Sequence, residues 1–186
     1  MAYVNGVFVE LSEARVPVED RGYQFADGVY EVIATYNGRS FALEEHLIRL
    51  QHSLDKVSIK FNVFDYGIGK RVSSGISLAG FEETLVYVQI TRGVAPRRHE
   101  FPSSKTRPSI VMTFKPLERL SQKIFETGVE IVSVPDLRWK RCDIKTTALL
   151  ANVLAKQEAS KQGAFEALLV NVKGILQKGL TPAYFG

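Results

Sequence analysis

Lys145 is the residue whose setting in the sequence points most directly to chemistry. Residues 147–162 have the pattern of an amphipathic helix, with Thr146 or Thr147 able to cap its start and Gly163 suited to its end. The apolar residues that recur one turn apart in this stretch are Leu149, Leu150, Val153 and Leu154. Lys145 is therefore predicted to stand at a helix N-terminus, where the helix dipole disfavours a second positive charge and favours a neutral amine. The alternative is an ordinary surface lysine in a loop.

A loop in the middle of the chain carries a second group of candidates. Pro96 and Pro102 restrict its backbone, and Arg97 and His99 are separated by one residue. Both side chains could converge on one anion, and a small anionic ligand needs only two or three such cations. Arg98, between them, has the character of a solvated arginine and is left out of the predicted site.

Tyr30 lies in a predicted strand, residues 28–36, which is closed by an Asn-Gly turn. The strand alternates between two faces. One face is formed by Tyr30, Val32 and Ala34, and the other by Glu31, Ile33 and Thr35. From the residues alone, Tyr30 is either a ligand-facing tyrosine or a half-buried strand aromatic.

Arg49 lies in a predicted helix, residues 41–57, away from its apolar row. That row is Leu43, Leu47, Leu50, Leu54 and Val57. On pattern alone, Arg49 reads as a solvated helix arginine. The remaining predicted elements are a hairpin at 3–9, a helix at 65–78 weakened by glycines, and strands at 83–92, 109–114, 128–134 and 165–170.

The composition is that of an ordinary globular protein and narrows the classes of function. The chain of 186 residues is 45% hydrophobic and 24% charged, with a formal net charge of +4. Its basic residues are scattered, which argues against a nucleic-acid groove. One cysteine excludes an internal disulfide, and three histidines without ligand spacing predict no metal site. No signal peptide or membrane-spanning run is evident, so we expect a cytoplasmic location.

Three stretches, in this order along the chain, resemble the class IV pyridoxal-phosphate aminotransferases. They are Asp-Arg-Gly-Tyr-Gln-Phe-Ala-Asp-Gly-Val-Tyr-Glu at 20–31, Thr-Arg-Gly at 91–93 and Arg-Cys-Asp-Ile-Lys-Thr at 141–146, and the resemblance runs to about Leu169. It implies an α+β, fold-type-IV architecture: a small α/β domain at 1–115, a connector at 116–124, and at 125–170 the beginning of a larger, β-rich pseudobarrel domain. The implied cofactor is pyridoxal 5'-phosphate.

The resemblance also assigns the site. Lys145 would bind the cofactor covalently and move the substrate's α-proton, and Arg49 would hold the cofactor phosphate. Tyr30 and Val32 would face the substrate. Arg97 and His99 match the Arg-x-His pair by which D-amino acid aminotransferases bind the substrate α-carboxylate.

This assignment implies a reaction and a partner. The pair at 97 and 99 favours transfer of the amino group from D-alanine to 2-oxoglutarate, giving pyruvate and D-glutamate. Members of the family dimerise, so we expect a homodimer in which this loop enters the partner's site. The alternatives are a branched-chain aminotransferase, an aminodeoxychorismate lyase of the same class, and a catalytically inactive fragment or oligomerisation module.

The end of the chain departs from the family pattern. After the strand at 165–170 the family places a short strand ending in Thr-Glu-Gly, whose glutamate meets the cofactor's pyridine nitrogen, and then a serine-rich loop. Residues 171–186 differ. A shift of reading frame from Lys173 would allow Asp-Ile-Thr-Glu-Gly-Ser within the degeneracy of the code, and resequencing the gene would test it. With much of the large domain missing, we expect the apolar faces of 129–134 and of the helix after Lys145 to be poorly covered.

Overall fold

The computed structural model describes residues 1–179, which divide into two compact units. Unit 1 contains Met1–Glu118 and Asp143–Ala148, and unit 2 contains Arg119–Cys142 and the chain from Leu149 onward. The division at 118 lies inside the connector expected at 116–124. Residues 143–148, which the sequence analysis assigned to the second domain, belong instead to the first unit, and they bring Lys145 with them.

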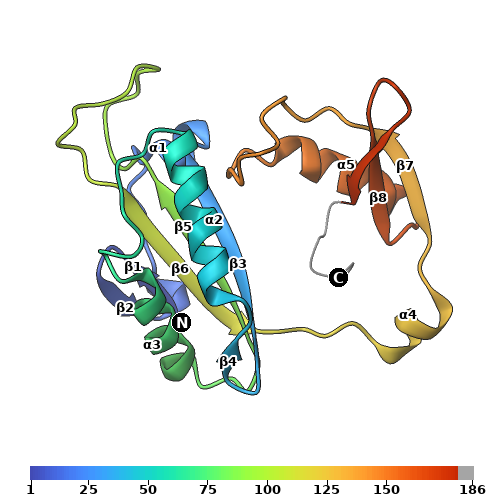
Figure 1. The fold of residues 1–186 in the computed structure, drawn as a ribbon, viewed down its shortest axis with the longest axis horizontal. Helices are drawn as coiled ribbons and strands as arrows, with labels where there is room; N and C mark the ends of the chain where they lie inside the picture. Colours follow the sequence, from blue (N-terminus) through green and yellow to red (C-terminus); the bar gives the residue numbers. More distant parts are fainter. Residues whose placement is uncertain (180–186) are drawn as a thin grey trace. The chain divides into compact units, whose positions relative to one another are not determined.

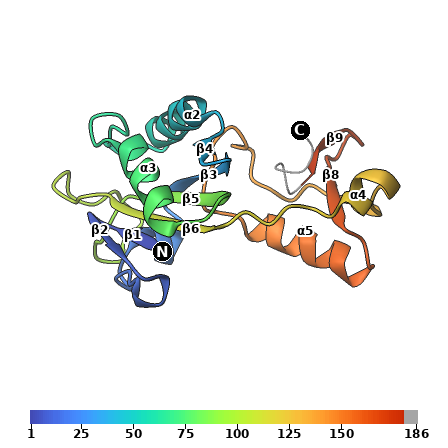
Figure 2. The same cartoon turned by 90° about the horizontal axis from the view of Figure 1, so that it is seen from below.

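Unit 1 is built on one antiparallel sheet of six strands (Figures 1 and 2). Their order across the sheet is β2-β1-β6-β5-β3-β4. The strands are β1 (Ala2–Val4), β2 (Val7–Val9), β3 (Gly28–Tyr36), β4 (Arg39–Ser40), β5 (Thr84–Thr91) and β6 (Ser109–Pro116). The helical elements are a 3₁₀ turn at Leu11–Glu13, α1 (Arg21–Phe25), α2 (Leu43–Lys56) and α3 (Ile68–Ala79).

Two helices cover one face of this sheet (Figure 2): α2 packs on β3, and α3 packs on β5 and β6. The predicted apolar row of α2 is the reason, since Leu47, Leu50 and Leu54 are buried. Glu44 and Glu45 in its first turn and Lys56 in its last suit the helix dipole. The covered face of β3 carries Val29, Glu31, Ile33 and Thr35, all buried, whereas Tyr30, Val32 and Ala34 on the other face are half-buried.

Unit 2 has a three-stranded sheet in the order β7-β8-β9, in which β7 and β8 are parallel and β8 and β9 antiparallel. Its elements are α4 (Gln122–Thr127), β7 (Ile131–Pro135), α5 (Leu150–Lys161), β8 (Glu166–Val170) and β9 (Leu176–Gly179). The turn between β8 and β9 is closed by Asn171, whose side-chain oxygen accepts from the amides of Lys173 and Ile175. Residues 171–179 of the predicted aberrant tail thus form a hairpin arm, and residues 180–186 lie outside the described part. The proposed frameshift stays a prediction.

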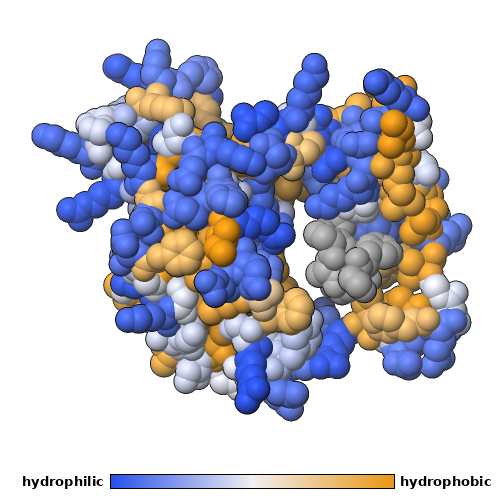
Figure 3. Space-filling model, in the orientation of Figure 1, coloured by the Kyte–Doolittle hydropathy of each residue, from blue (hydrophilic) through white to orange (hydrophobic). Residues whose placement is uncertain are grey.

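Apolar side chains remain exposed in unit 2, as the sequence analysis expected. On α5, Leu150, Val153 and Leu154 are 71%, 60% and 60% exposed, and only Ala155 and Ala159 are buried. Phe125 of α4 and Ile131 of β7 are exposed too, and apolar surface follows these two elements in Figure 3. Within residues 1–179 no helix is both long enough and apolar enough to cross a membrane.

Candidate functional site

The segment that carries Lys145 is attached to the open edge of β3. The amide of Tyr30 donates to the carbonyl of Lys145 at 3.0 Å, and the amide of Thr147 donates to the carbonyl of Gly28 at 3.1 Å. Because β4 pairs only with the end of β3, this first part of the strand is free to accept a neighbour. Ile144 anchors the segment in the core of unit 1.

Helix α2 holds the same segment from its other side. The ammonium of Lys56 lies 3.0 Å from the carboxylate of Asp143, and the amide of Lys145 donates to the hydroxyl of Ser53 at 3.3 Å. Ser53 is buried, so this bond is shielded from water. Lys145 is therefore positioned by a strand and a helix that lie more than fifty residues earlier in the sequence.

The capping prediction for this region is wrong. Helix α5 begins at Leu150 without a side-chain cap. The hydroxyl of Thr146 donates to the carbonyl of Gly28, and that of Thr147 to the carbonyl of Ala26, each at 3.0 Å. Because both hydroxyls bind the carbonyl of Gly28 at the start of β3, they hold the segment on unit 1, and the helix-dipole argument for a lowered pKa of Lys145 loses its basis.

The side chain of Lys145 lies against Tyr30. Its Nζ is 4.2 Å from the centre of the Tyr30 ring, a cation–π distance. The Tyr30 ring stacks on that of Tyr87, with centroids 5.5 Å apart, and Val32 pairs with Tyr87 in the sheet, so these side chains share a face. Burial raises the pKa of Tyr30, as does the Glu31 charge, and burial beside Tyr30 raises the pKa of Tyr87 to about 12. Both phenols are thus protonated at neutral pH.

A buried carboxylate binds Arg49 on the helix-covered side of β3. Arg49 donates from Nε to one oxygen of Glu31 at 2.5 Å and from Nη2 to the other at 2.8 Å. The Nδ1 atom of His46 lies 2.8 Å from Glu31. Burial raises the pKa of Glu31, but the hydrogen bonds from Arg49 and His46 and the charge of Lys145 outweigh it, so the pKa is lowered. Glu31 is therefore ionised and links the arginine electrostatically to the lysine.

The pairing with Glu31 leaves Arg49 able to bind a second anion. Its side chain is 56% exposed, and among the described residues its hydrogen bonds are made by Nε and Nη2. The Nη1 group remains for a ligand, and the Glu31 hydrogen bond raises the pKa of the guanidinium further. The reading of Arg49 as a merely solvated helix residue is wrong, and Glu31 and His46 are neighbours that sequence analysis missed.

Arg97 and His99 form a separate group around Phe25. The Arg97 guanidinium lies 5.1 Å from the centre of the Phe25 ring, and the His99 ring lies 5.4 Å from it. Both side chains are exposed. The structure thus places Lys145 against Tyr30, connects Arg49 to Lys145 through the charge of Glu31, and collects Arg97 and His99 at the end of α1.

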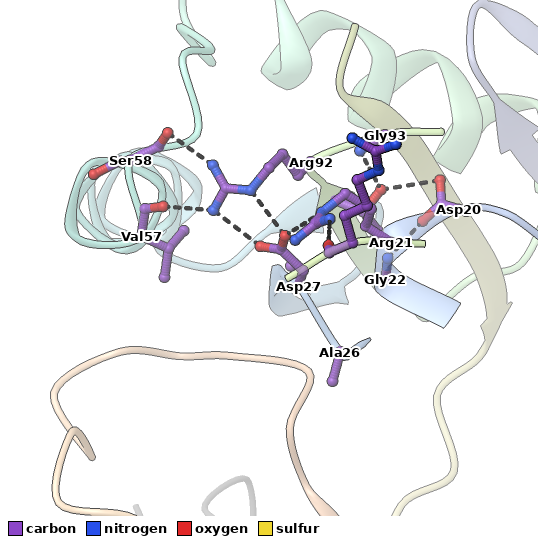
Figure 4. Close-up of polar contacts among 12 residues, drawn as sticks. Asp20, Arg21, Gly22, Ala26, Asp27, Val57, Ser58, Arg92 and Gly93 are labelled. Carbon is purple, nitrogen blue, oxygen red and sulfur yellow. Dashed lines mark hydrogen bonds and ion pairs between the residues drawn. The ribbon is translucent and has the colours of Figure 1, made fainter. Parts of the chain in front are cut away.

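Three further charged residues, which sequence analysis missed, connect the stretches at 20–31 and 91–93 through ion pairs (Figure 4). Asp27 accepts from Arg21 and from Arg92, and all three side chains are largely buried. All three lie in the stretches at 20–31 and 91–93 that carried the resemblance. That position in the motifs could have identified them, but no role was predicted for their charges. No cluster of His, Cys, Asp and Glu side chains that could hold a metal ion occurs in residues 1–179.

The chain belongs to the class IV aminotransferase family, whose pattern matches residues 28–185. A D-alanine aminotransferase of Bacillus licheniformis is 39% identical over 175 residues, which are 94% of this chain and 61% of that protein. A D-alanine aminotransferase of Staphylococcus aureus strain MSSA476 is 39% identical over 98% of this chain and 64% of its own length. The chain therefore spans somewhat less than two thirds of these relatives.

Solved structures confirm the fold. The 4-amino-4-deoxychorismate lyase of Pseudomonas aeruginosa superposes with a TM-score of 0.81 at 22% identity, covering 97% of this chain and 64% of that one. A hypothetical aminotransferase of Mycobacterium tuberculosis in its pyridoxal-phosphate-bound form gives 0.78 at 18% identity, covering 97% and 65%. The predicted family and α+β fold class are thus confirmed, and class IV aminotransferases use pyridoxal 5'-phosphate.

Proposed function

We propose that this chain binds pyridoxal 5'-phosphate through Lys145 and carries the lysine half of a D-amino acid aminotransferase site. The observation that carries the proposal is the position of the Lys145 amine, 4.2 Å from the Tyr30 ring and within electrostatic reach of Glu31. The residues present suit the cofactor: an amine for its aldehyde, an aromatic ring beside that amine, and the exposed guanidinium of Arg49 for its phosphate.

The bound cofactor would supply an electron sink for charge that develops on the substrate α-carbon. Lys145 would take the proton from the α-carbon of the amino acid that gives up its amino group. In the reverse half-reaction it would give a proton to the α-carbon of the amino acid that is formed. Arg49, with its orientation set by Glu31, would fix the phosphate. Tyr30 and Val32 would form the wall against which the substrate lies, and its orientation would decide which face of the α-carbon meets the lysine.

The substrate proposal is D-alanine with 2-oxoglutarate, giving pyruvate and D-glutamate. It is supported by the relatives named above and by Arg97 and His99, whose side-chain N–H groups can donate to a carboxylate. We also propose a cytoplasmic homodimer in which the loop of one chain serves the site of the other. A branched-chain aminotransferase, an aminodeoxychorismate lyase and an inactive chain remain the competing functions.

The test is a pyruvate-release assay on the purified chain with D-alanine, and a parallel assay with L-leucine. We expect turnover of D-alanine that falls at least tenfold in Arg97→Ala, because one charge-assisted bond to the carboxylate is lost. The matched variant Arg98→Ala should retain it. Turnover of L-leucine that is insensitive to Arg97 would favour the branched-chain activity, and bound cofactor without any turnover would favour the inactive chain.

The dimer proposal has its own test. The Lys145→Ala chain should be inactive and the Arg97→Ala chain at least tenfold less active, and mixing them should restore activity above that of either variant, since one site of the mixed dimer has both residues intact. Absence of restoration in dimers shown to exchange subunits would contradict a shared site.

A further inference from the structure

Arg21 joins a buried ion cluster to the backbone of the loop that carries Arg97 and His99. Its Nε donates to Asp27 Oδ2 at 2.8 Å, and its Nη1 donates to the carbonyl of Arg98 at 2.6 Å. Arg21 is 3% exposed, although it is the first residue of a short surface helix. One buried guanidinium therefore fixes the peptide that lies midway between the two candidate carboxylate ligands.

Asp27 holds Arg21 in place because a second arginine shares it (Figure 4). Arg92 donates to both oxygens of Asp27, at 2.8 and 2.9 Å, and its other N–H groups bind the carbonyls of Val57 and Ser58 at the end of α2. Burial raises the pKa of Asp27, but the hydrogen bonds from Arg92 and Arg21 outweigh it and lower the pKa. The carboxylate is thus charged and connects α1, β5 and the end of α2.

Aromatic contacts hold the same loop on either side of the Arg98 carbonyl. Phe25 contacts the Arg97 guanidinium and the His99 ring, and the Arg21 guanidinium also lies 4.9 Å from its centre. Further along, Arg92 lies 3.8 Å from the centre of the Phe101 ring. The loop therefore rests on the two arginines that share Asp27.

The start of the loop is fixed by a close backbone approach. Gly93 has a φ of +98°, and a Cβ there would lie 2.0 Å from the carbonyl oxygen of Arg107. Its carbonyl accepts from the amide of Arg21 at 3.0 Å. The stretches at 20–31 and 91–93 are thus parts of one support for the loop.

We infer that Arg21 is a positioning residue for substrate binding: through the Arg98 carbonyl it sets where Arg97 and His99 stand, and Asp27 and Arg92 hold it there. This rests on the proposed function of Arg97 and His99 as carboxylate ligands. A lysine cannot replace Arg21, because its single ammonium lacks the planar fork that reaches two acceptors at once.

The test is the imidazole NMR spectrum of the purified chain, which has three histidines. His99→Gln assigns the His99 signal, and Phe25→Leu shows where that signal lies without the aromatic ring. Arg21→Lys should move the His99 signal toward its Phe25→Leu position and leave His46 and His52 in place. The matched control Arg98→Lys keeps the backbone carbonyl and should leave all three signals unchanged.

Asp27→Glu is the second variant, because it keeps the charge while moving the carboxylate by one methylene. It should shift the His99 signal in the same direction. A folded Arg21→Lys or Asp27→Glu chain with an unmoved His99 signal would overturn the inference.

Kinetics separate this inference from the function on which it rests. With substrate, Arg21→Lys should raise KM for D-alanine about tenfold, the effect of one misaligned charge-assisted bond, and change kcat less. A displaced His99 signal with an unchanged KM would keep the positioning role and remove the carboxylate role. If the chain shows no turnover, the NMR comparison alone decides the positioning role.

Discussion

The amine of Lys145 lies 4.2 Å from the centre of the Tyr30 ring, while the Lys145 carbonyl accepts the Tyr30 amide at 3.0 Å. Lys145 and Tyr30 are thus in contact through both their backbones and their side chains. The position of Lys145 is set by β3, because the segment that carries the lysine pairs with the edge of that strand. Residues that attach this segment should therefore affect cofactor binding as much as those that touch the ligand.

Thr146 provides the first prediction. Its hydroxyl is buried and donates to the Gly28 carbonyl, so Thr146→Val keeps the shape and removes the bond. We expect a loss of about 1–2 kcal/mol in the attachment of the segment and faster amide hydrogen exchange at residues 143–148. Thr127→Val, which alters an exposed hydroxyl in α4, is the control. Equal exchange in both variants would contradict the edge-strand attachment.

Glu31 should determine how well Arg49 binds the phosphate of the cofactor, because it fixes the orientation of the guanidinium. In Glu31→Gln the arginine loses its charged, two-point anchor, and although the guanidinium charge is less neutralised, we expect the loss of fixed orientation to win. Affinity for pyridoxal phosphate, followed by fluorescence quenching, should fall about tenfold. Glu45→Gln, at an exposed position of α2, should bind normally. Unchanged affinity in Glu31→Gln would remove Glu31 from the site.

The buried carboxylates predict how stability depends on pH. The folded-state pKa values of Asp27 and Glu31 are both lowered by their arginine partners. Their contribution is therefore complete above the unfolded-state values of about 4 and is lost as pH falls through the lower folded-state values. Urea unfolding should show constant stability from pH 7 to about 5 and a steep loss below about pH 4. A flat profile down to about pH 3 would contradict the ionised pairs.

Removing the charge of Asp27 should lower the free energy of unfolding. Asp27→Asn leaves two buried guanidinium groups without their shared anion, so we expect a loss of about 3 kcal/mol or more in the free energy of unfolding. Asp136→Asn is the comparison, because Asp136 pairs with the arginine two residues away, outside any shared cluster. Urea midpoints that fall equally in both variants would contradict a special role for the Asp27 cluster.

The packing of α3 on the sheet can be tested at Gly75. A Cβ built there would lie 2.0 Å from the Phe114 ring, which is itself buried. Gly75→Ala should therefore destabilise unit 1 by about 1–3 kcal/mol, although alanine favours helices. Gly69→Ala, whose nearest neighbour is the flexible end of Leu47 at 3.2 Å, should cost less. The opposite order, measured by thermal unfolding, would contradict the observed helix contact.

Local pattern was sufficient for much of the fold. The strand predicted at 28–36 matches β3, and the helix predicted at 41–57 contains α2, because a period of two and a period of 3.6 are written in the residues themselves. The start of α5 could not be obtained this way. Thr146 and Thr147 have the chemistry of caps, yet their hydroxyls bind the carbonyl of Gly28, the first residue of a strand far away in sequence. Tertiary hydrogen bonds prevailed over local preference.

The candidate site shows the same difference between what local pattern predicts and what tertiary contacts decide. The setting of Lys145 in the sequence, with the resemblance, identified it as a candidate, whereas Arg49 was identified by the resemblance alone. The roles of Glu31 and Arg21 depend on which charges meet across the fold, and no periodicity in a single sequence records such pairing. Buried charges are found by asking which cation each carboxylate meets, a question that requires the three-dimensional structure.

Covalent capture of the cofactor tests the central claim most directly. The purified chain is incubated with pyridoxal phosphate, reduced with borohydride to make the lysine–cofactor bond permanent, digested and mapped by mass spectrometry, with Lys145→Ala as the control. We predict selective labelling at Lys145 that disappears in the variant. Labelling spread thinly over many lysines, or the same pattern in Lys145→Ala, would contradict the assignment of this residue as the cofactor-binding lysine.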